Sequence, residues 1–325
     1  MRNVLRLRQM FFLTILILVS PAVCVFASDA WPQRPVRFIV PIVPGSSPDV
    51  AARIFGEKLS EQWHQPVVIE NRAGADGLIG TAAFAHMQDD HVFLFSFAAP
   101  ITVFPETQKN LPYDAGRDIV PVSAATDTFG TISAPASLQV TTLSELVALA
   151  RSKPGQLNWT SGGGAFPILF GGFLKDAGLD MVQVPYRNQG LAIQDVAEGR
   201  VQVIVTPMTA VLPLVQAGRI RVLAVTSKRR SPLWPDVPTS TEAGYPDLAF
   251  EGLIGIFGPR DTPSERRDRI AKDIRTIAAD PFVAKHLAAA GQVARASTPL
   301  EFVSAINDQR SQIERIVKLI GMPKQ

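Results

Sequence analysis

Short apolar runs and helix-like patterns alternate in the first third of the chain. The runs "VRFIV", "VVIE" and "VFLFS", which begin at Val36, Val67 and Val92, are typical of buried strands. Residues 49–63 and 78–87 repeat their apolar positions at helical spacing. Strands and helices that alternate over short connections predict a parallel sheet with right-handed crossovers.

The same alternation returns after residue 140. We expect strands at "LNWT", "MVQVP", "VQVIV" and "RVLAVT", and helices at 143–151, 168–176, 191–198 and 211–217. The chain therefore contains two α/β units, with no internal repeat and no long linker between them. We expect the joins between the two units to be strands.

The C-terminal part has a different pattern. A strand is expected within "AFEGLIGIFGP", and helices are expected at Pro263–Ala279, Pro281–Ala289 and Pro299–Ile320. A proline near the start of a helix fits these boundaries, because the first turn leaves its N–H groups unbonded in any case.

The N-terminus is organised like a secretory signal peptide. "MRNVLRLRQ" is basic and lacks acids, an apolar run follows, and "VFA" ends the segment with residues that a signal peptidase reads. We expect residues 1–27 to be removed by cleavage after Ala27. The first alternative is a membrane anchor, but the apolar run is short for a membrane span and Pro21 interrupts it. The second alternative is a lipoprotein site at Cys24, but the valine before this cysteine is bulky for such a site.

Removal of this segment changes the charge and the cysteine content. The full chain has 32 Lys and Arg against 29 Asp and Glu, and the loss of Arg2, Arg6 and Arg8 leaves 29 of each. A nearly neutral mature chain gives no indication of nucleic-acid binding. Cys24 is the only cysteine, so the mature chain needs no disulfide.

Two joins between a strand and a helix are candidates for ligand binding. "PGSSPD" at 44–49 and "TSGGGA" at 160–165 both place small residues after an apolar strand and before a helix. In open α/β sheets ligands bind beyond the carboxyl ends of the strands, and the N–H groups of a helix start attract anions. Both loops suit a carboxylate or phosphate, although the first is also compatible with a simple capped turn.

Other chemical signals are weak. "ENRAGADGLIG" from Glu70 repeats glycine every third residue without the order of a dinucleotide-binding loop. No nucleophile elbow, zinc-protease motif or cysteine pair occurs. His86 and His91 are expected on the surface, without a ligand-like partner. No pair of acids is placed for acid–base catalysis, and no metal site or cofactor is expected.

The segment "RPVRFIVPIVPGSSPDVAARIFGEKLSEQWHQPVVIENRAGADGLIG" resembles the TctC-like receptors of tripartite tricarboxylate transporters, the Bug-type extracytoplasmic solute receptors. The resemblance continues through "LPYDAGRDIVPV", "VPYRNQGLAIQDVAEGRVQVIV" and "FGPRDTPSERRDRI", and covers roughly Trp31 to the end. Each motif is weak alone, but in combination they are specific for this receptor family.

The resemblance implies a two-domain periplasmic binding protein fold of the Venus-flytrap type II. Each domain would be a mostly parallel sheet flanked by helices, and two strands would cross between them. Domain 1 would comprise 31–127 and 251–325, and domain 2 would comprise 128–250. The implied function is that of a monomeric periplasmic receptor, without catalysis, that captures a small carboxylate between the domains for membrane transporter subunits. The solute would be an organic acid or an amino acid.

The resemblance also implies which residues hold the ligand. The expected ligand-binding residues are Pro44, Gly45, Ser46, Ser47, Asp49, Gly74, Ala75, Thr160, Ser161, Gly162, Gly163, Gly164, Ala165, Thr206 and Pro207. Binding would rest on backbone N–H groups and hydroxyls. An ion pair with an arginine such as Arg187 remains an alternative.

The chain departs from the family pattern at several positions. Ser46 replaces the second glycine of the first loop, Ile168 replaces a histidine, Gly172 replaces a frequent glutamate and Gln202 replaces an aspartate. These changes leave the identity of the ligand open. Two other functions also remain open, which are a sensory partner of a membrane kinase and a secreted α/β enzyme.

Overall fold

The computed structural model describes residues 31–186 and 188–324. The expected signal peptide, with Cys24 and its cleavage site, lies outside the described residues, as does Arg187. Residues 34–325 form one compact unit.

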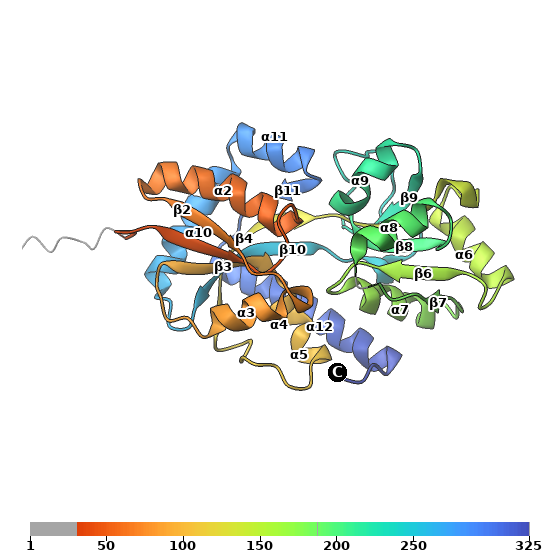
Figure 1. Cartoon of the computed structure of the whole chain (residues 1–325), viewed down its shortest axis with the longest axis horizontal. Helices are drawn as coiled ribbons and strands as arrows, with labels where there is room; N and C mark the ends of the chain where they lie inside the picture. The colour runs from red at the N-terminus through yellow and green to blue at the C-terminus, as the bar shows by residue number, and fades with distance from the viewer. Residues whose placement is uncertain (1–30, 187, 325) are drawn as a thin grey trace, which may run out of the picture. The chain divides into compact units, whose positions relative to one another are not determined.

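The first sheet has six strands (Figure 1). In the order in which they lie side by side, they are β11 (Gln292–Ala294), β4 (Ile119–Thr128), β10 (Gly252–Pro259), β3 (Val92–Phe97), β1 (Val36–Val40) and β2 (Val67–Asn71). β1 pairs in parallel with both β2 and β3, which confirms the parallel sheet predicted for the first unit. β10 is antiparallel to β3 and β4, so the complete sheet is mixed.

Helices cover both faces of this sheet. They are α2 (Ser47–Trp63), α3 (Leu78–Ala85), α4 (Ala99–Thr102), α5 (Phe104–Thr107), α10 (Ser264–Ala278), α11 (Pro281–Ala289) and α12 (Pro299–Ile320), with the 3-10 turn η1 (Ala75–Gly77). Figure 1 shows α2 and α11 on one face and α3, α4 and α12 on the other. The three C-terminal helices begin within one residue of the predicted positions.

The second sheet has five strands. In order they are β7 (Val182–Gln183), β6 (Asn158–Ser161), β8 (Val203–Pro207), β5 (Gly130–Pro135) and β9 (Ile220–Val225). Its helices are α6 (Leu143–Ser152), α7 (Phe166–Asp176), α8 (Gln189–Ala197) and α9 (Met208–Gln216), with the 3-10 turns η2 (Ala136–Leu138) and η3 (Pro246–Leu248). β6, β7 and β8 are parallel, whereas β5 runs antiparallel to its neighbours β8 and β9.

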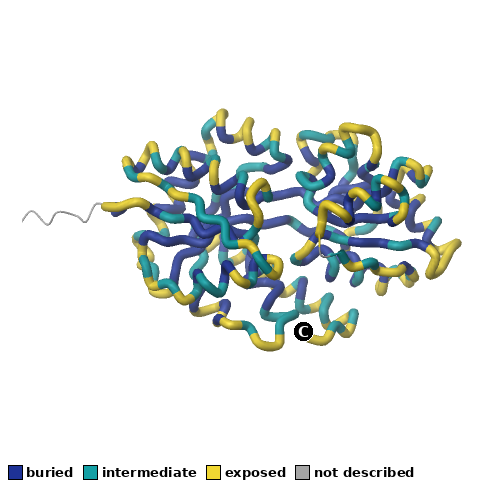
Figure 2. Tube along the Cα trace, viewed as in Figure 1, coloured by how far each residue is buried: buried dark blue, intermediate teal, exposed yellow. Residues whose placement is uncertain are grey.

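A strand passage joins the two sheets at the first crossing, as predicted. β4 ends at Thr128 in the first sheet, and β5 begins at Gly130 in the second. The return differs from the prediction, because residues 226–251, with turns and η3, separate the end of β9 from the start of β10 at Gly252. These crossing strands are almost entirely buried (Figure 2), because both of their faces are covered by side chains. The proposed domain limits at 127/128 and 250/251 fall close to these joins and stay a prediction.

Helix α12 packs against elements of both sheets' parts of the molecule. It contacts β4 and α4 of the first part and also α7 of the second. Gly172 of α7 makes this possible, because a Cβ there would lie 2.4 Å from Cγ2 of Ile316 on α12. On the first sheet, Phe302 of α12 is fully buried, with its ring centroid 5.1 Å from that of Phe257. One hydrophobic cluster therefore extends across both parts.

Some predictions about local structure were wrong. The run "MVQVP" forms strand only at Val182–Gln183. His91 is buried rather than on the surface, because it directly precedes the buried strand β3 and its Nδ1 lies 2.6 Å from Oδ1 of Asp90. His86 is exposed, as predicted.

Candidate ligand-binding site

A cavity of about 380 Å³ opens between the helix starts of the two parts. Its walls come from the loops that follow β1, β3, β6 and β8, and from Thr128 and Gly252 where the crossing strands pass. This is the carboxyl edge of the parallel strands, where α/β sheets bind ligands. The volume is within the usual range for small-molecule sites, roughly 300–1,000 Å³.

The first candidate loop lines the cavity with Pro44, Gly45, Ser46 and Ser47. Gly45 has φ +81°, a conformation that favours glycine. Its N–H donates to Oδ2 of Asp49 at 2.9 Å, which closes the loop onto the first turn of α2. Asp49 itself is buried and does not line the cavity, so its role in the structure is to shape the loop.

Asp49 is held as a carboxylate by its surroundings. Burial alone would raise its pKa, but hydrogen bonds from Arg53, from the N–H of Gly45 and from Asn71 bring that pKa below its ordinary value. The group is therefore ionised at neutral pH, and it can accept all three hydrogen bonds at once.

The two serines of this loop differ in their contacts. The Oγ of Ser46 is buried at the cavity and has no hydrogen-bond partner among the described residues. The Oγ of Ser47 lies 3.0 Å from Oγ1 of Thr209 on α9, so this pair links the two sides of the cavity. Behind it, Nε2 of Gln292 donates to the carbonyl oxygen of Ser47 at 3.0 Å.

The second candidate loop lines the cavity with Gly163, Gly164 and Ala165. Within the described part of the chain, the N–H groups of these three residues donate to no protein acceptor. Thr160, Ser161 and Gly162 lie behind the loop, at or just beyond the end of β6, and do not reach the cavity wall. The three successive N–H groups are thus available to a bound anion.

Three helices begin at the cavity without a side-chain cap. They are α2, α7 and α9, and no side chain accepts a hydrogen bond from their first turns. The helices α6, α8, α11 and α12 are capped by Thr142, Asn188, Asp280 and Thr298, and of these α8 also begins at the cavity, with Gln189. A helix start without a cap leaves N–H groups unbonded and carries partial positive charge, which favours an anion.

The remaining walls are mainly apolar. Phe166 and Phe250 face each other edge to face, with ring centroids 6.4 Å apart, and Phe97, Pro100 and Leu253 extend the same surface. Ser96, Thr102 and Gln309 add a few polar groups. No lysine, arginine or histidine lines the cavity among the residues that the structure describes, and Asp76 is the one ionisable group there.

The structure brings together some of the expected residues and not others. The cavity wall includes Pro44, Gly45, Ser46, Ser47, Gly163, Gly164, Ala165 and Pro207. It does not include Asp49, Gly74, Ala75, Thr160, Ser161, Gly162 or Thr206. Thr206 is instead bonded to Gln189 through its hydroxyl, and it packs under Gly162. Gly74 and Ala75 lie in the loop that carries Asp76.

Several lining residues were missed by sequence reasoning. Asp76 lies inside the glycine-rich segment 70–80, and Gln189 and Thr209 stand in the first turns of helices that were predicted to begin later. An earlier start for these helices would have placed both residues at the same sheet edge. Gln309 comes from the long C-terminal helix, and no local signal marks it.

Three of the four departures from the family pattern lie away from the cavity wall. Ile168 and Gly172 are buried in α7. Gln202 accepts a hydrogen bond from the N–H of Asn158 at 2.9 Å and donates to the carbonyl of Gly199 at 3.0 Å. Among these changes only Ser46 faces the cavity.

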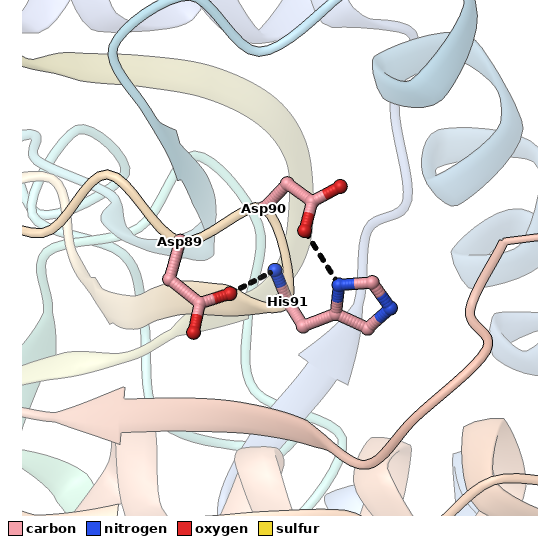
Figure 3. Close-up of side chains that lie close together, drawn as sticks. All are labelled: Asp89, Asp90 and His91. Atoms are coloured by element: carbon pink, nitrogen blue, oxygen red, sulfur yellow. Dashed lines mark hydrogen bonds and ion pairs between the residues drawn. The ribbon is translucent and has the colours of Figure 1, made fainter.

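Asp89, Asp90 and His91 form a second cluster of polar side chains (Figure 3). One ligand atom from each lies within 4.8 Å of the others, close enough for a metal ion. Arginines already balance the charge, because Arg34 bonds to Asp89 at 2.6 Å and Arg266 bonds to Asp90 at 2.7 Å. The hydrogen bond from Arg34 also holds the pKa of Asp89 below its ordinary value. The cluster is best explained as a structural ion-pair network that joins the start of β3 to α10.

The described helices give no sign of a membrane span. None of those in residues 31–186 and 188–324 combines the length and the apolar character that crossing a bilayer requires.

Comparison with known proteins places the chain among solute receptors. BugT from Bordetella pertussis is 31% identical over 299 residues, covering 91% of this chain and 92% of its own. A UPF0065 protein from Pseudomonas sp. strain P51 is 32% identical over 295 residues, covering 90% and 87%. The solved structure of R. palustris Rpa4515 with adipate is 27% identical, with a TM-score of 0.82, and covers 91% of this chain and all of the other.

The family model completes the assignment. Residues 51–322 match the description "Tripartite tricarboxylate transporter family receptor". Solved relatives described as periplasmic binding or transport proteins share the arrangement of two mixed sheets, which is the type II binding-protein fold. The chain therefore belongs to the receptor family of the tripartite tricarboxylate transporters.

Proposed function

We propose that this chain is a monomeric periplasmic receptor that captures a small carboxylate in the cavity and delivers it to a tripartite membrane transporter. The family supports the transport role. The related Rpa4515, solved with adipate, supports a carboxylate as the ligand class.

The observation that carries the proposal is the set of unbonded hydrogen-bond donors at the cavity. The N–H groups of 163–165 and the Oγ of Ser46 have no partner among the described residues. The helices α2, α7 and α9 begin there without a side-chain cap, whereas α8, which also begins there, is capped by Asn188. A bound carboxylate would accept hydrogen bonds from the N–H groups of 163–165 and from Ser46, and would serve as the missing cap. Gly74, Ala75, Thr160, Ser161, Gly162 and Thr206 would then support the two loops from behind.

The site favours binding over catalysis. Ser46, Ser47 and Thr209 supply hydroxyls, but no described base lies against any of them in the cavity. A nucleophile needs such a base within hydrogen-bond reach. We therefore propose that the ligand leaves unchanged.

A binding screen tests the proposed function. Small carboxylic acids and their primary amides should be compared by thermal unfolding, and we expect at least one acid, but not its amide, to stabilise the protein. Because Ser46 would donate a buried hydrogen bond to the ligand, Ser46→Ala should weaken binding of that acid, measured by calorimetry, by about 5- to 150-fold. Ser311→Ala, at an exposed position on α12, is the matched control and should have no effect. Equal binding of amides, or no binding of any acid, would refute the proposal.

Export is the second part of the proposal. We propose that residues 1–27 are a signal peptide, because a basic start, an apolar run and "VFA" follow one another. N-terminal sequencing of the protein recovered from the periplasm should begin at Ser28. A retained Met1 or a lipid on Cys24 would contradict this expectation.

A further inference from the structure

We propose that the preferred ligand is a zwitterion, an acid that also carries a positively charged ammonium group, and that Asp76 binds this group. The inference rests on the proposed function, because it assumes that a carboxylate occupies the uncapped helix starts. It deepens that function by naming the chemical class of the ligand and the residue that selects it.

The charge inventory of the cavity is the first argument. Asp76 is the only ionisable side chain in the cavity wall that the structure describes. Its carboxylate makes no hydrogen bond and no ion pair within the described part of the chain. Asp76 is exposed to solvent, whereas the buried carboxylates Asp49 and Asp127 are paired with arginines. An unpaired carboxylate that lines a ligand cavity can form a charge-assisted hydrogen bond with a cation that enters the cavity.

The loop that holds Asp76 is the second argument. Ala75 has φ +46° and Asp76 has φ +53°, between Gly74 at +145° and Gly77 at +100°. Two successive residues other than glycine in the left-handed region cost energy, and such strain gathers at ligand sites. This strained backbone therefore orients the side chain of Asp76 differently from an unstrained loop.

The position of Asp76 across the cavity is the third argument. All three atoms of its carboxyl group lie 2.7 Å from the point where a Cβ of Gly163 would stand. The carboxylate of Asp76 therefore touches the loop whose N–H groups are unbonded. A ligand whose carboxylate is bound at residues 163–165 would therefore lie within reach of the Asp76 side chain.

The sign of the charge decides between ligand classes. A diacid would bring a second negative charge to a cavity that has no described cation and already holds Asp76. In a cavity with mainly apolar walls the effective dielectric is lower than in water, so this repulsion is stronger there. An ammonium group would instead form a charge-assisted hydrogen bond with Asp76. The apolar wall around Phe166 and Phe250 would cover the carbon skeleton of the ligand.

A matched series of compounds tests this inference. Succinate, butanoate, 4-aminobutanoate and 2-aminobutanoate share a chain of four carbons, and adipate, hexanoate, 6-aminohexanoate and 2-aminohexanoate share one of six. Calorimetry should show that one amino acid binds about tenfold or more tightly than both the monoacid and the diacid of its length. Asp76→Asn, which keeps the size of the side chain, should remove that advantage. Asp236→Asn, at an exposed position outside the cavity wall, should leave it unchanged.

The outcomes separate this inference from the proposed function. If a monoacid or diacid binds as tightly as the amino acids, or if Asp76→Asn leaves the ranking of affinities unchanged, the preference for a zwitterion is refuted. The proposal of a carboxylate receptor is not affected by that result. If none of the eight compounds binds, the inference is overturned, and the wider screen of acids and amides decides the proposed function alone. Thermal unfolding of Asp76→Asn should match that of the unmodified protein, since the side chain makes no hydrogen bond within the described residues.

Discussion

Gly163→Val is expected to weaken binding of the carboxylate ligand at least about 30-fold while the protein remains folded. The Cβ of a valine would meet the carboxyl group of Asp76 at 2.7 Å, and the two methyl groups would extend into the cavity. The ligand would then lose contact with at least two N–H groups of 163–165, each of which contributes about 1–3 kcal/mol when buried. Gly163 is exposed and has no positive φ, so the backbone itself tolerates the change.

Two further variants make this result specific. Gly116→Val also replaces an exposed glycine, in a turn away from the cavity, and should bind the ligand normally. Arg187→Gln tests the alternative that an arginine holds the carboxylate by an ion pair. If Arg187→Gln abolishes binding and Gly163→Val does not, the backbone mechanism is wrong.

The fold was largely predictable because its elements carry strong local signals. The parallel group β2-β1-β3 follows from apolar runs separated by amphipathic helices. The starts of α11 and α12 are marked by proline after a capping residue, Asp280 or Thr298. By contrast β11 has three residues, and its identity as a strand depends on pairing with β4 from a distant part of the chain. Such pairing leaves no local pattern.

Helix starts were predicted too late where the first turn contains small or polar residues. α2 begins at Ser47, α7 at Phe166 and α9 at Met208, each before the apolar repeat becomes regular. These first turns form the cavity wall, so the error in the boundaries concealed the site itself. Residues that serve a ligand instead of a core do not repeat at helical spacing.

The candidate site was predictable in outline and not in detail. The loops at 44–47 and 163–165 could be recognised from their small residues, and both line the cavity. The sequence could not show that Asp76 touches Gly163, because the two residues are 87 positions apart and follow strands of different sheets. The contact arises only when the two sheets pack together in the folded chain.

Gly172→Leu is expected to lower the free energy of unfolding by about 3 kcal/mol relative to Gly171→Leu. A Cβ at residue 172 would stand 2.4 Å from Cγ2 of Ile316, so a leucine must push α7 away from α12. Forcing extra atoms into a packed contact of this kind costs typically 1–3 kcal/mol, and leucine is a large addition. Because α12 also packs on the first sheet, the strain cannot be relieved by moving one helix alone.

The neighbouring glycine supplies the matched control. A Cβ at Gly171 has no atom within 4 Å, and the same helix then receives the same leucine on an open face. Both variants remove one glycine from α7, so the gain in helix propensity, about 1 kcal/mol, is common to them and cancels in the comparison. Chemical denaturation of the two proteins measures the difference directly. Equal stabilities would mean that α7 and α12 do not pack through Gly172 and Ile316, and the connection of the two sheets by α12 would have to be abandoned.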